Sequence, residues 1–165
     1  MKREKWSDLK ASLKTTLGTI NTLNQSNKVT IINFSDGVRV DYQDTPPNSI
    51  SLDVLTFQGG GTNFAAAFKE GFSQMKLITN TDIVLVFMTD GGSLYPRNEI
   101  ALINEYVKSS DFKKLGTKFS FNALGFQCTS SILTEMAKAL GGTTYFAHDR
   151  AQLTKTFIEI LNKQQ

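Results

Sequence analysis

The feature that most constrains the fold is the apolar segment at 83–88, Ile-Val-Leu-Val-Phe-Met. Six residues suit a strand better than a helix, and an apolar run without alternation is typical of a parallel strand covered by helices on both faces. The run is followed directly by Thr89-Asp90-Gly91-Gly92. Ligands bind open parallel sheets beyond the carboxyl ends of their strands, so Asp90 is a candidate site residue.

The remaining pattern alternates between helix and strand. Helical stripes occur at 6–23, 64–75, 100–107, 132–140 and 153–161, and strand patterns at 29–34, 38–42, 118–126 and 144–146. The polar segment 24–27 ends the first helix, and Asp36-Gly37 predicts a hairpin turn. Pro46-Pro47 predicts a loop without regular structure, and Gly141-Gly142 predicts a helix C-cap. This order predicts an α/β fold with a doubly wound, mostly parallel sheet flanked by helices, in a single domain over 1–165.

Composition excludes several classes of partner. The 165 residues include 18 basic and 15 acidic side chains, a formal net charge of +3. Apart from a short cluster at 1–5 the basic ones are scattered, which does not support a nucleic-acid interface. No apolar stretch is long enough to span a membrane, and the charged start is not a signal peptide. The one cysteine, Cys128, fits a reducing compartment. We therefore expect a cytoplasmic location.

A second motif, Gly59-Gly60-Gly61-Thr62-Asn63, opens the helical pattern at 64–75. The oxygens of Thr62 and Asp90 would suit a hard cation such as Mg²⁺. Simpler interpretations stay open, because a threonine before a helix is commonly an N-cap and an Asp-Gly after a strand is commonly a turn. No Gly-Lys-Ser/Thr follows the glycines, so a nucleotide P-loop is not indicated.

Taken together, several segments resemble a von Willebrand factor type A domain. They are the helix with Trp6 and Leu9, the strand end Phe34-Ser35-Asp36, Gly-Gly-Thr-Asn-Phe, and Phe-Met-Thr-Asp-Gly, in this order over essentially the whole chain. The resemblance implies a six-stranded sheet whose edge binds one divalent cation at a metal-ion-dependent adhesion site. It assigns Thr62 and Asp90 to the metal, and the surrounding positions to a binding rim: Gly60, Gly61, Asn63, Gly91 and Ser93.

One part of the family pattern is missing, namely the Asp-x-Ser-x-Ser loop after the first strand. We expect that strand to lie upstream of Met1, so that the domain lacks it. By the resemblance it would lie between 29–34 and 83–88, and its loss leaves two rows of backbone groups without partners. The sheet could then close in a new register, accept a strand from another chain, or fold only partly. Two protein oxygens, only one of them from a carboxylate, would bind Mg²⁺ weakly or not at all.

The resemblance implies a non-enzymatic protein-interaction module whose partner presents an acidic side chain. The alternative is a small α/β metal-dependent hydrolase or phosphatase-like enzyme that uses Asp90 as a nucleophile or metal ligand. The sequence offers no second carboxylate or lysine near Asp90 in an expected motif, which disfavours the enzyme.

Overall fold

The computed structural model describes residues 2–24, 26–79 and 81–164. Met1, upstream of which the missing strand is expected, and Gln25, in the polar segment after the first helix, lie outside these ranges. The helices are α1 (Arg3–Leu23), α2 (Phe64–Met75), α3 (Arg97–Lys108), α4 (Ser110–Lys114), α5 (Ser131–Ala139) and α6 (Arg150–Asn162). The strands are β1 (Val29–Phe34), β2 (Val38–Thr45), β3 (Ile83–Thr89), β4 (Phe119–Phe126) and β5 (Thr143–Ala147).

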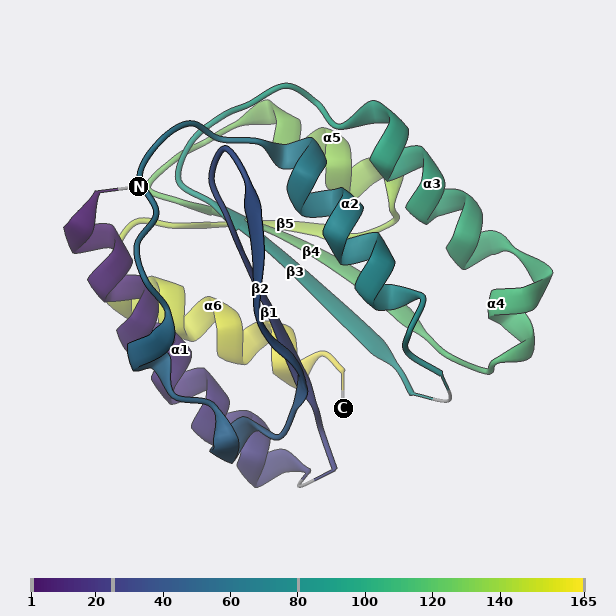
Figure 1. Ribbon diagram of the computed structural model, residues 1–165, viewed down its shortest axis with the longest axis horizontal. Helices are drawn as coiled ribbons and strands as arrows, with labels where there is room; N and C mark the ends of the chain where they lie inside the picture. Colours follow the sequence, from purple (N-terminus) through teal and green to yellow (C-terminus); the bar gives the residue numbers. More distant parts are fainter. Residues whose placement is uncertain (1, 25, 80, 165) are drawn as a thin grey trace.

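A parallel sheet of β3, β4 and β5, in that order, forms the centre of the molecule. Every residue of β3 pairs with β4, from Ile83 opposite Phe119 to Thr89 opposite Gly125. Helices α2, α3 and α5 lie on one side of this sheet, and α1 and α6 lie on the other (Figure 1). The fold is therefore the α/β arrangement that the sequence predicts, with a mostly parallel sheet between two helical layers.

Alternate residues of the strands enter two separate cores, as the period of a strand requires. Ile83 and Phe87 of β3 pack with α2, α3 and α5 in the larger core. Val86 and Met88 pack against the smaller core, which α6 and α1 cover. Helices on both faces explain why 83–88 has no polar positions, and this part of the sequence prediction is confirmed.

The strands β1 and β2 form a separate antiparallel hairpin, and no hydrogen-bond ladder joins it to β3 within the described ranges. The six-stranded sheet of the family is not continuous in this chain, which has five described strands in two sheets, and the break lies between β1 and β3, where the resemblance places the missing strand. The rings of Phe34 and Phe87 stack at 5.4 Å between centroids, and Phe64 of α2 packs edge-on against both. Aromatic side chains connect the two sheets. Within the described chain, closure in a new register has not occurred.

Smaller differences have local causes. A short 3-10 turn, η1 (Pro47–Ser49), begins at the second proline, where the fixed φ of proline suits a first helical position, so the prediction of no regular structure there is wrong. A second 3-10 turn, η2 (Leu52–Val54), follows. The five-residue α4, absent from the sequence expectation, begins where the side chain of Ser109 accepts a hydrogen bond from the Phe112 N–H at 3.2 Å. None of the described helices is long and apolar enough to cross a membrane.

Candidate functional site

Three loops meet where β1 of the hairpin and β3 of the parallel sheet terminate: 35–37, 59–63 and 90–93, called the rim below. The Asn63 N–H donates to the Ser35 carbonyl at 2.8 Å. The Ser93 hydroxyl donates to the Thr62 carbonyl, also at 2.8 Å. These two bonds join segments that lie about 30 residues apart in sequence. The structure thus brings both predicted motifs, with all seven predicted site residues, into one region.

Asn63 fixes where the helix after the glycine run begins. Its side-chain oxygen accepts a hydrogen bond from the Ala66 N–H at 3.0 Å, which makes Asn63 the N-cap of α2. Its amide nitrogen donates to the Asp36 carbonyl at 3.3 Å. The alternative interpretation of Thr62 as the N-cap is therefore wrong. Thr62 is an exposed residue on the rim, and its role as a metal ligand stays a prediction.

Asp36 is a rim residue that sequence reasoning treated as part of a turn and of a strand end, and not as a site residue. A Cβ atom built on either Gly60 or Gly61 would collide with the carboxylate of Asp36. Gly60 also has φ +112°, a conformation that side-chain-bearing residues rarely adopt. The glycines therefore leave room for a carboxylate to lie directly on the loop backbone. The sequence could have indicated this role, because Asp36 follows a predicted strand and the glycine run precedes a predicted helix at the same end of the sheet.

Asp90 forms an ion pair that the sequence did not predict. Its Oδ2 atom lies 3.3 Å from Nζ of Lys5, in the first turn of α1, and each side chain is 19% exposed. The sequence analysis found no lysine near Asp90 within a local motif, and the structure corrects this by placing Lys5 beside Asp90. Helix α1 lies along the sheet and brings Lys5 to the carboxyl end of β3, a contact across 85 positions that no local pattern reveals.

The end of β3 is closed by a local turn. The buried Thr89 hydroxyl accepts a hydrogen bond from the Gly91 N–H and donates to the Gly91 carbonyl, both at 3.2 Å. The Cys128 thiol lies 3.5 Å from the Thr89 carbonyl. Burial, with a further contribution from the negative charge of Asp90, raises the pKa of Cys128 above its ordinary value. A thiol that stays protonated at neutral pH is a poor nucleophile.

The residues of the rim do not fit a divalent cation. No cluster of three or more His, Cys, Asp or Glu side chains suited to a metal occurs in the described part of the chain. Asp90 is paired with an ammonium group that would repel Mg²⁺, and the Ser93 hydroxyl is bonded to Thr62. The carboxylate of Asp36 lies against Gly60 and Gly61. Mg²⁺ needs several oxygen ligands in a near-octahedral arrangement, so this set is too small and already paired.

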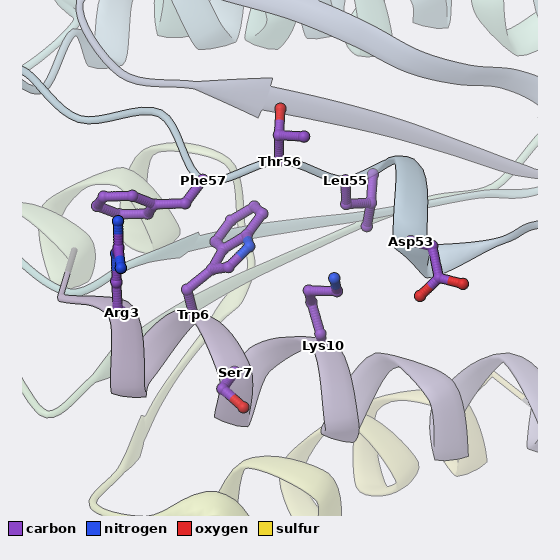
Figure 2. Close-up of a pocket in the computed structure, with 8 residues that line it drawn as sticks. All are labelled: Arg3, Trp6, Ser7, Lys10, Asp53, Leu55, Thr56 and Phe57. Atoms are coloured by element: carbon purple, nitrogen blue, oxygen red, sulfur yellow. The ribbon is translucent and has the colours of Figure 1, made fainter.

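A hollow of about 460 Å³ lies beside the rim, between α1 and the segment that leads into the glycine run. Its edge-to-face pair of Trp6 and Phe57 has ring centroids 6.1 Å apart. Figure 2 shows Trp6 pointing from α1 toward this segment, with Arg3 beside Phe57. The full lining is Arg3, Trp6, Ser7, Lys10, Asp53, Leu55, Thr56 and Phe57. The hollow is open and carries cationic and aromatic groups on the α1 side.

Comparison with known proteins identifies the fold. No protein-family pattern and no curated protein sequence matches the chain. Among solved structures, a von Willebrand factor type A protein from Catenulispora acidiphila aligns at a TM-score of 0.71 and 20% identity, covering 96% of this chain and 38% of that one. The SpRpn10 VWA domain aligns at a TM-score of 0.63 and 12% identity, covering 92% of this chain and 81% of that domain.

Proximal thread matrix protein 1 from the mussel byssus, in a structure with a zinc-occupied MIDAS motif, aligns at a TM-score of 0.66 and 15% identity. The alignment covers 96% of this chain and 40% of that one. The chain thus spans well under half the length of two of these three proteins. At such low identities, structural similarity establishes the fold and not the activity. This chain has a von Willebrand factor A-like fold.

Proposed function

We propose that this chain is a protein-interaction module that contacts its partner at the rim. The observation that carries the proposal is the hydrogen bond from Ser93 to the Thr62 carbonyl, which holds the two motif loops together. The rim combines the exposed Thr62 and Asn63 with fixed backbone, a surface suited to contact and not to enclosing a small substrate. The resemblance adds that the partner group would be an acidic side chain, and the missing Asp-x-Ser-x-Ser loop leads us to expect weak Mg²⁺ binding or none.

No observation favours the alternative of a metal-dependent hydrolase. A nucleophilic or metal-bound Asp90 would have to leave its ion pair with Lys5. The nearby thiol of Cys128 has a raised pKa. The residues near Asp90 therefore supply neither an activated nucleophile nor a set of metal ligands.

The proposal is tested with matched synthetic peptides. Each pair has one Glu or Asp in an otherwise neutral sequence, against Gln or Asn at the same position, and binding to the full 165-residue chain is followed by fluorescence anisotropy. We expect a subset of the acidic peptides to bind more tightly than their amide partners. Thr62→Ala should weaken that binding. Thr22→Ala, an exposed threonine on the far part of α1, is the matched control and should not.

Two results would count against this function. Binding that ignores the acidic group, or that survives every rim substitution, would place the interaction elsewhere. Turnover of p-nitrophenyl phosphate that disappears in Asp90→Asn would replace the binding module by the hydrolase.

A further inference from the structure

The Lys5–Asp90 pair lies at the rim position where the resemblance assigns a metal ion. The Lys5 ammonium lies 3.3 Å from the Asp90 carboxylate, and with 19% exposure each, both side chains are largely withdrawn from water. An ion pair in such a position is screened by solvent less than one on the open surface. Lys5 is held there by α1, a helix of 21 residues.

Helix α1 is itself anchored to α6. The Asp8 carboxylate pairs with the Arg150 guanidinium at 2.8 Å, and the Thr154 hydroxyl donates to the Ser12 hydroxyl at 2.9 Å. Ser12 is fully buried against α6. The helix therefore cannot slide without breaking these contacts. Lys5 is delivered to Asp90 by a fixed element and not by a flexible loop.

We infer that the Lys5 ammonium serves as the cation of this rim, so that the site works without a metal ion. A divalent cation that approached Asp90 would have to displace Lys5 against the repulsion between two positive charges. It would gain few other ligands, since no cluster of acidic, histidine or cysteine side chains lies among the described residues. This explains in physical terms why the donor set of the rim does not fit Mg²⁺.

A consequence for recognition follows, and it rests on the proposed function. An ammonium group has three N–H donors, and Asp90 needs only one or two of them. A partner's carboxylate can accept a remaining donor, in a charge-assisted hydrogen bond that is shorter and stronger than a neutral one. Lys5 would then bridge Asp90 and the acidic group of the partner. Such binding should be insensitive to chelators.

The metal part of this inference is tested on the full chain by thermal melting with MgCl₂ or EDTA. The wild-type melting temperature should be the same in both. Lys5→Glu places a second carboxylate beside Asp90, and Mg²⁺ relieves the repulsion, so we expect Mg²⁺ to raise its melting temperature by about 2–4 °C. The double variant Lys5→Glu/Asp90→Asn should lose that response. Lys14→Glu is the matched control, because Lys14 is an exposed residue farther along the same helix, and it should show no response.

A second variant covers the case in which Lys5→Glu does not fold. Lys5→Gln removes the charge and keeps a polar, slightly shorter side chain. Mn²⁺ should broaden the amide NMR signals of Gly91 and Ser93 in Lys5→Gln and leave those of the wild type unchanged. Equal broadening in both proteins, or in neither, would overturn the inference. So would a rise of the wild-type melting temperature with Mg²⁺ that Asp90→Asn abolishes.

The recognition part uses the acidic peptides described above. Their binding should survive EDTA and fall at least about tenfold in Lys5→Gln, the loss expected for one charge-assisted hydrogen bond. Binding that EDTA abolishes would overturn this part. If no peptide binds through its acidic group, the proposed function fails while the melting and NMR results still decide whether Lys5 replaces the metal.

Discussion

Alanine substitutions in the glycine run should separate two reasons for having glycine there. Gly60 has both a positive φ of +112° and the Asp36 carboxylate in the way of a Cβ atom. Gly61 has only the carboxylate in the way, and Gly59 has open space. The three neighbouring positions thus form a graded series within one loop. Their effects on the free energy of unfolding can be worked out separately.

For Gly61→Ala, the obstacle is the end of an exposed side chain, which can rotate away. Moving Asp36 from its preferred rotamer costs on the order of 0.5–1.5 kcal/mol. In an Asp36→Ala background this cost vanishes, and the restriction of the unfolded chain by alanine should stabilise the protein by about 0.4–1 kcal/mol. Gly61→Ala should therefore be more favourable in the Asp36→Ala background than in the wild type, by about 0.5–1.5 kcal/mol.

For Gly60→Ala, the backbone strain adds about 1–2 kcal/mol, and no change at Asp36 can relieve it. We expect this variant to stay destabilised in the Asp36→Ala background. Gly59→Ala, the control, should be neutral or slightly stabilising in both. Urea denaturation of the six proteins with both parents measures all of these differences. If Gly61→Ala were equally destabilising with and without Asp36, the carboxylate would not lie on the loop and the argument would be refuted.

Three further substitutions or measurements check the rest of the structure. Phe87→Ala should lower the free energy of unfolding by about 3–5 kcal/mol in urea, because its buried ring packs against Phe34, Phe64 and Phe68, and Phe87→Leu should cost clearly less. Asn63→Ala should lower the free energy of unfolding by about 0.5–2 kcal/mol because the N-cap hydrogen bond is lost, and Asn63→Asp should lower it much less. Equal losses for the two variants in urea denaturation would argue against capping. Cys128 should react with iodoacetamide at neutral pH more slowly than a free cysteine, because its pKa is raised, and an equal rate would contradict this. Its contribution to the free energy of unfolding should fall only as the pH rises above 9.0, the ordinary pKa of a cysteine thiol.

The sequence predicted the elements of the fold well because their signals are local. The apolar stripe of α2, the unbroken run of β3 and the Gly141-Gly142 stop after α5 depend on residues within one element. Gly141 indeed has φ +65°, as a helix-terminating glycine should. Local patterns alone could not separate β1 from β3, because strand neighbours are chosen by contacts between distant segments. The gap between these two strands was expected only from the family resemblance, which places the missing strand there.

The candidate site was predicted in part for the same reason. The two motifs were visible as short strings, and the strand-end rule placed Asp90 at the correct edge. The roles of Lys5 and Asp36 were missed, since each depends on how one element lies against another. Lys5 looked like one of several charges near the start of the chain, and only the path of α1 along the sheet brings it to Asp90. Contacts of this kind have no sequence spacing that could reveal them.

In the described sheet, strand β3 is hydrogen-bonded to another strand at one edge only. The Ile83 N–H donates to the Lys118 carbonyl at 2.8 Å, so alternate residues from Ile83 onward bond to β4. The backbone groups of Val84, Val86 and Met88 then face the opposite edge, which in the described sheet has no neighbouring strand. No strand is hydrogen-bonded to this edge of β3 in the described sheet. The hairpin is therefore held beside β3 by the stacked rings of Phe34 and Phe87 and not by a ladder. The position of loop 35–37, and with it Asp36 on the rim, therefore depends on aromatic packing in the core.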